Sequence, residues 1–246
     1  MILGIDFGTC YSYVSVMIGD KIVEDAVTVS GNANIPSLYM QVGNKEYYGP
    51  ECLGERGRKY KDHVTLIRDN PDYLKMPIGE GANIQTYEDI IKKFLKYLID
   101  LAKKSTNQKI EYVAITAPTA LTRRGMQNSG YNFLLKQTIM ELTDLDEYHV
   151  FVKEEPVAAA YSYLYDNKVK RDQSIFVFDL GGGTLDVSLV EYSYKNDEIR
   201  VVLTDGDSIG GVLWTNELAR LIKTDMINRN IDITDFDQLY GEKVEE

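Results

Sequence analysis

The sequence predicts an α/β protein built from a duplicated unit, in which paired strands alternate with amphipathic helices. Three observations support this fold class. An apolar strand, a glycine-rich turn and an alternating strand follow one another at Val177–Val190, and the same pattern opens the chain at Ile2–Val16. Between them, apolar residues recur at helical spacing from Thr86 to about Lys104. Two copies of one pattern indicate two lobes whose turns face one another across a cleft.

The first lobe is predicted to begin with three antiparallel strands, because apolar and polar residues alternate there and Gly19-Asp20 forms a two-residue turn. These strands are expected at 2–7, 11–18 and 21–28, followed by a short hairpin at 38–42 and 46–48. Thr86 is the expected N-cap of the helix that follows. Further strands are expected at 112–116 and 150–152, and further helices at 122–142 and 157–165.

The second lobe is predicted to repeat the first, with strands at 174–180, 186–194 and 198–204. A helix with one apolar face then follows. That face consists of Trp214, Leu218, Leu221, Ile222 and Met226. The polar segment 166–173 is the expected hinge between the lobes, and the acidic end, 230–246, is expected to be solvated or frayed.

The glycine-rich turn of the second lobe has the composition of a phosphate site. It consists of Gly181, Gly182, Gly183 and Thr184. A turn of bare backbone presents N–H groups rather than side chains. With Asp179 and Asp186 beside it, this turn suits a polyphosphate whose charge is neutralised by a divalent metal ion. Glycines also serve ordinary hairpins, so the turn alone leaves both interpretations open.

The N-terminal turn repeats this arrangement. It consists of Gly8, Thr9, Cys10 and Tyr11, and Asp6 precedes it. In a duplicated fold the two turns can clamp the phosphates of one nucleotide from both sides, with Asp6 and Asp179 flanking the metal ion. Cys10 is interpreted here as a small buried residue in preference to a redox-sensitive group.

A third motif lies just before the second turn and reads Glu154-Glu155-Pro156-Val157-Ala158-Ala159-Ala160-Tyr161. The three motifs, in order and spacing, resemble the nucleotide-binding domain of the seventy-kilodalton heat-shock (DnaK-type) chaperones. That family belongs to the actin-like, sugar-kinase-like ATPase superfamily. The resemblance extends from residue 1 to about residue 225. It implies an actin-like ATPase (ribonuclease H-like) fold with a first lobe at 1–170, a small inserted subdomain at about 29–110, and the beginning of a second lobe at 171–246.

The resemblance implies ATP or ADP with Mg²⁺ as the cofactors. Asp6 and Asp179 would hold the magnesium ion, chiefly through its water ligands, because this ion dehydrates reluctantly. Backbone N–H groups of Gly8–Cys10 and of Gly181–Thr184 would cradle the β- and γ-phosphates, and Tyr11 would complete the first turn. The carboxylates gathered in such a cleft repel one another, so nucleotide affinity is expected to depend strongly on magnesium.

Four residues are expected to take part in hydrolysis: Glu155, Asp186, Thr184 and Arg68. The resemblance implies that Glu155 and Asp186 orient the attacking water. A glutamate followed by proline also opens a helix on structural grounds alone. Arg68 is the candidate for a phosphate-contacting lysine of the family, although an exposed loop arginine is an equal alternative. A planar guanidinium is not positioned like an ammonium, so hydrolysis would be slower or altered.

The chain also departs from the family's pattern. After Gly210-Gly211 the family has an acidic pair, whereas this chain has Val212-Leu213-Trp214. Pro118 matches a switch proline of the family, but it also closes a strand before a helix. Arg123 and Arg124 match the family's nearby arginine only approximately. The rest of the second lobe, an adenosine-binding Gly-Gly motif and a substrate-binding domain are not present. We expect a piece of a longer protein in preference to a short natural relative.

Composition limits the classes of partner. Acidic residues outnumber basic ones, 38 to 27, and the net charge of −11 argues against nucleic acid or an anionic membrane as a standing partner. Two cysteines, Cys10 and Cys52, form no disulfide framework and no metal-ligand spacing. No signal peptide or membrane-length apolar run is visible, so a cytoplasmic protein is expected.

The resemblance implies nucleotide as the direct partner. In the full-length protein it implies a peptide-binding domain, unfolded clients and co-chaperones, with nucleotide state controlling peptide binding. Alternatives that share the phosphate turns are a filament-forming actin-like ATPase, a small-molecule kinase of the same superfamily, and a catalytically weak nucleotide-binding module. The Glu-Pro-x-Ala-Ala-Ala segment favours the chaperone ATPase.

Overall fold

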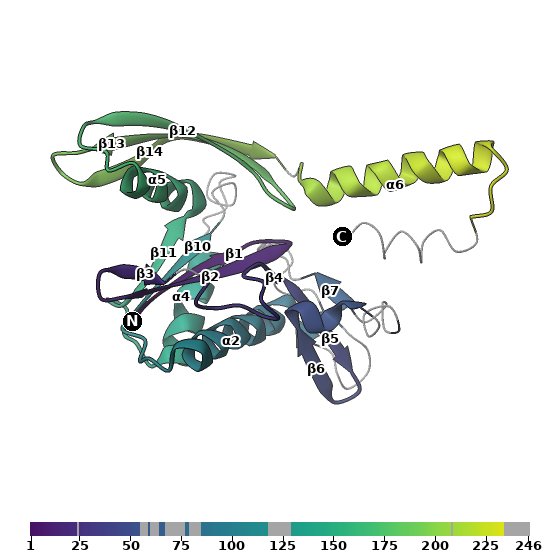
Figure 1. The fold of residues 1–246 in the computed structure, drawn as a ribbon, viewed down its shortest axis with the longest axis horizontal. Coiled ribbons are helices and arrows are strands. Elements are labelled where there is room, and N and C mark those ends of the chain that lie inside the picture. The colour runs from purple at the N-terminus through teal and green to yellow at the C-terminus, as the bar shows by residue number, and fades with distance from the viewer. Residues whose placement is uncertain are drawn as a thin grey trace.

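The computed structural model describes residues 1–23, 25–54, 59, 64–66, 77–78, 85–117, 129–207 and 209–233. Its larger sheet runs in the order β11-β10-β1-β2-β3, and β4 also pairs with β2 (Figure 1). The strands are β1 (Ile2–Phe7), β2 (Tyr11–Ile18), β3 (Lys21–Val23), β4 (Ile35–Pro36), β10 (Tyr112–Ala117) and β11 (Val150–Glu154). β1 is antiparallel to β2 and parallel to β10, which is in turn parallel to β11.

The main core lies between this sheet and two helices, α2 (Tyr87–Thr106) and α4 (Ser129–Thr143). Side chains of β1 alternate, so that Leu3, Ile5 and Phe7 are buried in this core while Asp6 is exposed on the other face. Helix α2 contributes a buried stripe, and the Phe94 ring lies 6.0 Å from the Phe7 ring. Alternation in the strand thus places Asp6 outside the core, where chemistry is possible.

Helix α2 begins at the predicted N-cap. The Thr86 hydroxyl accepts a hydrogen bond from the Asp89 N–H, and the Asp89 carboxylate accepts from the Thr86 N–H at 2.9 Å. These reciprocal bonds form a capping box, which satisfies two N–H groups that the helix itself cannot pair. The helix ends at Asn107 in the left-handed conformation.

We expect Thr86→Ala to lower the free energy of unfolding by about 1 kcal/mol, because the helix loses its cap. Urea denaturation followed by circular dichroism measures this change. Thr86→Ser keeps the hydroxyl and is expected to match the wild type. Equal losses in both variants would show that the cap does not stabilise this helix.

A three-stranded sheet, β6-β5-β7, lies beside the end of β2 and β4. Its strands are β5 (Leu38–Val42), β6 (Lys45–Tyr48) and β7 (Val64–Leu66), and a 3-10 helix, η1 (Gly49–Cys52), follows β6. Glu46 ties this sheet to α2, because its carboxylate accepts hydrogen bonds from Lys93 and from the hydroxyls of Tyr39 and Tyr48. The two-stranded pair β8 (Pro77–Ile78) and β9 (Gln85–Thr86) precedes α2.

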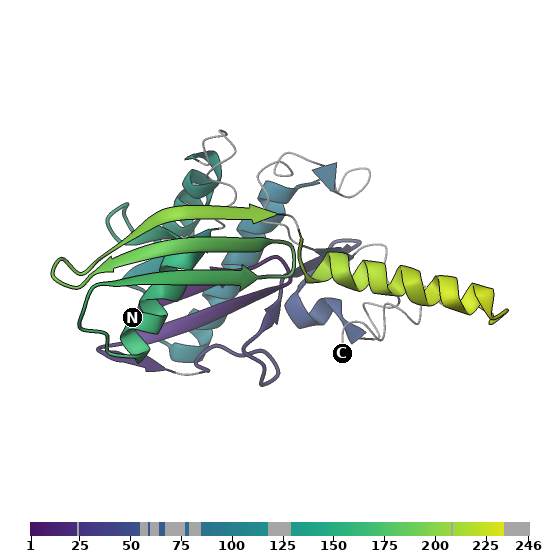
Figure 2. The same cartoon turned by 90° about the horizontal axis from the view of Figure 1, so that it is seen from above.

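A second three-stranded antiparallel sheet, β12-β13-β14, stands apart from the first. It consists of β12 (Gln173–Leu180), β13 (Leu185–Ser193) and β14 (Glu198–Asp207), and helix α5 (Glu155–Asp166) lies between it and the larger sheet (Figure 1). Figure 2 shows this sheet lying across the larger one. The three strands expected for the second lobe are therefore present, and the expected helix, α6 (Gly211–Asn228), follows them, while the proposed lobe boundaries stay a prediction.

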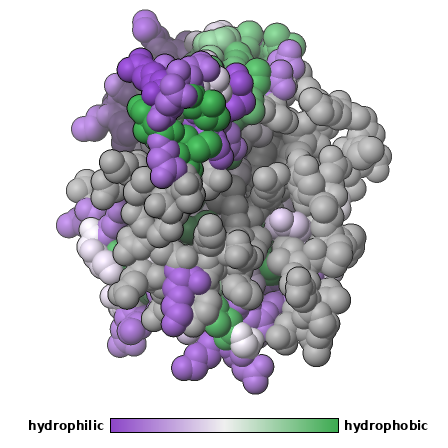
Figure 3. All heavy atoms as spheres, turned by 90° about the vertical axis from the view of Figure 1, so that its right-hand side faces the viewer, coloured by the Kyte–Doolittle hydropathy of each residue, from purple (hydrophilic) through white to green (hydrophobic). Residues whose placement is uncertain are grey.

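Helix α6 (Gly211–Asn228) projects away from both sheets (Figures 1 and 2). Its predicted apolar face is exposed: Trp214 keeps 65% of its surface and Leu218 keeps 59%. Within the described chain α6 buries a single side chain, Ala219. Figure 3 shows apolar side chains at the surface, surrounded by hydrophilic ones, on the side of the molecule from which α6 projects. The helical period was thus predictable, but the side chains have no core here.

Two other elements differ clearly from the predictions. The third strand ends at Val23 instead of Thr28, because Asp25 has a positive φ of 49°, which an extended strand does not allow. The helix expected from Thr122 is observed from Ser129, and 118–128 lie outside the described residues. None of the helices in the described part of the chain is both long and apolar enough to cross a membrane.

Candidate functional site

The two glycine-containing turns contact each other. The first connects β1 to β2 and the second connects β12 to β13. A Cβ atom built on Gly182 would lie 2.1 Å from Cys10 Sγ, and one on Gly183 would lie 3.0 Å from Thr9 Oγ1. No side chain therefore fits at Gly182 unless the first turn moves. The structure brings together the two repeats that are far apart in the sequence.

Ser37 holds the first turn in place through hydrogen bonds to two of its carbonyls. The Ser37 N–H donates to the Cys10 carbonyl at 2.8 Å, and its hydroxyl donates to the Gly8 carbonyl at 2.7 Å. The same hydroxyl lies 2.9 Å from the hydroxyl of Ser12, and both serines are buried. A Cβ on Gly8 would lie 2.4 Å from the Tyr11 carbonyl oxygen, so only glycine fits the turn. These contacts fix the backbone of the turn.

We expect Ser37→Ala to cost about 1–3 kcal/mol, because the half-buried Gly8 carbonyl and the buried Ser12 hydroxyl lose a partner. It is also expected to weaken nucleotide binding, since the first turn loses its support. Denaturation and calorimetry on the same preparation measure the two effects. Ser12→Ala, which leaves the bond to Gly8 in place, is the matched control. A loss of stability without a loss of affinity would contradict the link between this support and the binding site.

The second turn is joined to the start of α6. The Gly181 N–H donates to the Thr184 carbonyl at 2.9 Å, which closes the turn. The N–H groups of Gly211 and Val212 donate to the carbonyls of Gly181 and Gly182 at 3.0 and 2.9 Å. The first N–H groups of a helix have no partner within it, and here the turn supplies their acceptors. The beginning of α6 is therefore part of the site even though the helix itself projects outward.

Three carboxylates surround the two turns. Asp6 lies near the end of β1, and Asp179 on β12 lies directly opposite Asp186 on β13. Partial desolvation, together with the negative charges of Asp186 and Asp6, raises the pKa of Asp179. Such a group of like charges is stabilised by a cation. Asp6 and Asp179 thus form an electronegative site at the turns.

The donor set fits a hydrated magnesium ion. Carboxylate oxygens are the ligands that Mg²⁺ prefers, and the ion usually keeps several of its waters. In the part of the chain that the structure describes, no three His, Cys, Asp or Glu side chains converge closely enough to bind a metal ion directly. Binding through metal-bound waters is compatible with both observations.

Comparison with known proteins assigns the family. A model of the Hsp70 protein family matches residues 63–244. The chain belongs to the Hsp70 family. It is 31% identical over 226 residues to chaperone protein DnaK of Mycoplasmoides gallisepticum, an alignment that covers 90% of this chain and 36% of the relative. DnaK of Ureaplasma urealyticum is 30% identical over 253 residues, covering 95% and 37%, and DnaK of Metamycoplasma hominis is 30% identical over 231 residues, covering 89% and 35%.

The family assignment confirms the resemblance and the fold class that the sequence predicted. The protein has the actin-like ATPase fold of Hsp70 nucleotide-binding domains. The three alignments cover 35–37% of the length of these relatives. The chain thus spans about a third of the length of the curated relatives it matches. The Hsp70 match includes the second turn and the Glu-Pro segment, and the DnaK alignments extend over about nine tenths of the chain.

Of the other residues predicted for this Hsp70 chain, some lie within the described part of the structure and others lie outside it. Glu155 is half-buried at the corner where β11 ends and α5 begins, and Thr184 is half-buried in the second turn. Burial raises the pKa of the Cys10 thiol, which disfavours a reactive thiolate and supports its interpretation as a packed residue. Arg68 lies outside the described residues. Pro118, Arg123 and Arg124 lie outside them as well.

Two supporting groups escaped the sequence analysis. The sequence analysis assigned no role to Ser37, and it named Gly210 only as part of a family segment. A Cβ on Gly210 would lie 2.4 Å from the Gly182 carbonyl oxygen, so its role is to let the second turn approach. The Pro36-Ser37 pair was the available signal for Ser37, but the residues that Ser37 contacts, Gly8 and Cys10, are distant from it in the sequence.

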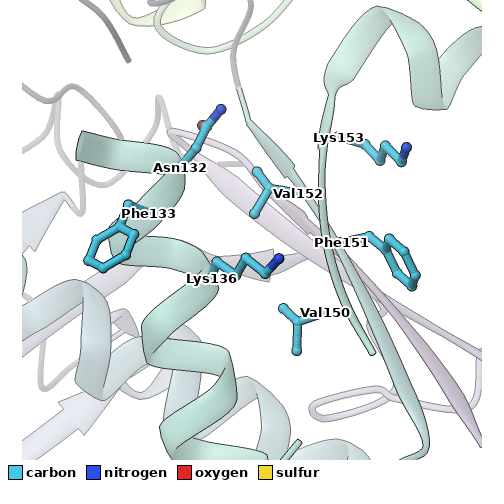
Figure 4. Close-up of a pocket in the computed structure, with 7 residues that line it drawn as sticks. All are labelled: Asn132, Phe133, Lys136, Val150, Phe151, Val152 and Lys153. Atoms are coloured by element: carbon cyan, nitrogen blue, oxygen red, sulfur yellow. The ribbon is translucent and has the colours of Figure 1, made fainter. Parts of the chain in front are cut away.

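A hollow of about 330 Å³ lies away from the turns, between α4 and the edge strand β11. Its lining residues are Asn132, Phe133, Lys136, Val150, Phe151, Val152 and Lys153. In Figure 4 Lys136 extends from α4 toward the strand, whereas Phe151 and Lys153 point to the other side of it. It contains none of the carboxylates described above, so we do not include it in the candidate site.

Proposed function

We propose that this chain is the ATP-binding and ATP-hydrolysing domain of a DnaK-type chaperone. The observation that carries this proposal is the direct contact of the two glycine-containing turns, with Asp6, Asp179 and Asp186 around them. Backbone N–H groups of paired turns favour an anion, whereas the adjacent carboxylates favour a cation. A nucleotide bound with magnesium satisfies both requirements.

In this proposal, N–H groups of the first and second turns bind the β- and γ-phosphates. The hydroxyls of Thr9 and Thr184 contact the same phosphates. Asp6 and Asp179 hold Mg²⁺ through its waters, and the bound ion neutralises charge on the phosphates. Thr9 and Thr184 are both half-buried, and a Cβ built on Gly183 would lie 3.0 Å from Thr9 Oγ1, which supports these roles.

In this proposal, Glu155, Asp186, Thr184 and Arg68 take part in hydrolysis. Glu155 and Asp186 orient the water that attacks the γ-phosphate in line, and Asp186 is the more buried of the two. Arg68 supplies positive charge where the family has a lysine. Because its planar fork differs from an ammonium, slow hydrolysis is expected. In the full-length protein, nucleotide state would control lobe closure and the affinity of a further domain for unfolded peptide. A cytoplasmic location stays a prediction.

Calorimetric titration of ATP and of ADP, each with and without Mg²⁺, tests this proposal. Binding is expected only, or far more strongly, with Mg²⁺, and phosphate release should follow slowly with ATP. Equal binding with and without the ion would overturn the proposed site. Nucleotide-dependent sedimentation would instead indicate a filament, and transfer of the γ-phosphate to a metabolite would indicate a kinase.

A further inference from the structure

We propose that Thr116 is a positioning residue for Asp6, the carboxylate that the proposed function assigns to hydrated magnesium. The inference rests on that function and names a residue outside every motif discussed above. Thr116 is the penultimate residue of β10, which runs parallel to β1. Because Ile5 pairs with Ile115, Thr116 lies beside the end of β1 where the first turn begins.

One hydroxyl connects the strand to the carboxylate. Thr116 Oγ1 donates to Asp6 Oδ1 at 2.8 Å and accepts from the Phe7 N–H at 3.4 Å. A hydroxyl has a single hydrogen and two lone pairs. A carboxylate has no hydrogen to donate, so the hydrogen of Thr116 is directed to Asp6, and one lone pair of the hydroxyl accepts from the Phe7 N–H. The chemistry of the two partners therefore determines the direction of this hydrogen bond.

The bond has a consequence for the metal site. A hydrogen bond to a carboxylate is charge-assisted, and it restricts rotation of the side chain. With Oδ1 held by Thr116, Oδ2 is left to accept from a metal-bound water. Groups that orient a metal-binding side chain in this way typically change metal affinity by about 10–100-fold when they are removed. We expect the lower part of this range, because Asp6 is exposed and would bind the ion through water.

The position of Thr116 also connects two parts of the site. On its other side β10 pairs with β11, where Thr116 lies opposite Lys153 and Ala117 lies opposite Glu154. The next residue after Glu154 is Glu155, the proposed water-orienting group at the start of α5. Thr116 thus lies on β10, between β1, which carries the proposed metal-binding Asp6, and β11, which leads to Glu155.

The test compares Thr116→Val with Thr116→Ser. Valine has nearly the same shape as threonine and favours strands, but it lacks the hydroxyl, whereas serine retains it. For each variant the Mg²⁺ concentration that gives half-maximal ATP binding is measured, together with urea unfolding in the absence of Mg²⁺. We expect the valine variant to need roughly tenfold more Mg²⁺ and the serine variant to match the wild type. Unfolding of both is expected to stay close to that of the wild type.

A double-mutant cycle shows whether Thr116 acts through Asp6. In an Asp6→Asn background, Thr116→Val is expected to weaken Mg²⁺-dependent binding no further. Additive losses would overturn the inference, and so would equal losses in the valine and serine variants, or a valine variant with wild-type Mg²⁺ dependence. A wild-type chain that binds no nucleotide would overturn the proposed function and this inference with it.

Discussion

Replacing Gly210 by alanine is expected to lower the free energy of unfolding by about 2–4 kcal/mol, near the upper part of the range for point substitutions. A Cβ at this position would lie 2.4 Å from the Gly182 carbonyl oxygen and 2.5 Å from the carbonyl carbons of Gly182 and Gly183. All of these atoms belong to backbone, which cannot rotate away as a flexible side chain does. The substitution forces the second turn and the start of α6 apart.

The neighbouring glycine is the matched control. At Gly211 the nearest atoms to an added Cβ are the Gly181 carbonyl oxygen and Gly182 Cα, both 3.8 Å away, which is an ordinary contact. Gly211→Ala is therefore expected to change stability by less than about 0.5 kcal/mol. Urea midpoints of both variants, with the slope checked against the wild type, measure the difference. Equal midpoints would contradict the close contact between Gly210 and the second turn.

A second readout separates the turn from the fold as a whole. If Gly210→Ala displaces the second turn, nucleotide binding should weaken at urea concentrations where the protein remains folded. Gly211→Ala should bind like the wild type. A Gly210→Ala protein with wild-type affinity would show that the second turn reaches its binding geometry without this contact.

The first two strands, the turn between them and helix α2 were predictable because their signals are local. In β1 and β2 apolar residues alternate on either side of a turn with glycine, and the observed bounds match the predicted ones. For α2, the sequence showed both a helical stripe and the N-cap at Thr86. Duplication then implied that the two turns approach each other, as Gly182 and Cys10 do.

The contacts that support the site were not predictable, because they join distant parts of the chain. Ser37 bonds to Gly8 across 29 residues, and Thr116 bonds to Asp6 across 110. A single hydroxyl has no periodicity that reveals its partner. The same limit applies to α6: its apolar stripe predicts a helix, but it does not predict what the stripe contacts. Sequence reasoning thus identified the residues proposed to contact phosphate and metal more readily than the residues that hold them in place.

Replacing Asp179 by asparagine is expected to have opposite effects on stability and on binding. Asp179 has a raised pKa in the folded protein, because desolvation and the charges of Asp186 and Asp6 disfavour its ionised form. A carboxyl whose folded pKa exceeds its unfolded value stabilises the fold most at low pH, and that stability is lost as pH rises through the folded pKa. At pH 7 without a cation, the ionised Asp179 therefore opposes folding.

Asp179→Asn is accordingly expected to raise the unfolding midpoint at pH 7 in the absence of Mg²⁺, and the gain should shrink as pH falls toward about 4, the ordinary pKa range of the group. The same variant is expected to lose at least roughly tenfold in Mg²⁺-dependent ATP affinity, since the carboxylate no longer contributes to the metal site. Asp20→Asn, at an exposed turn between β2 and β3, controls for the loss of one negative charge.

Because stability is expected to rise while ATP affinity falls, this experiment distinguishes a metal-binding carboxylate from a structural residue. A residue that merely supports the fold would lose stability and binding together when it is replaced. A carboxylate kept for a cation instead costs stability in the absence of the cation and gives binding energy in its presence, as expected of a functional group held among like charges. If Asp179→Asn loses stability at pH 7, or binds Mg-ATP as tightly as the wild type, Asp179 does not belong to a magnesium site, and the electronegative group at the two turns needs a different explanation.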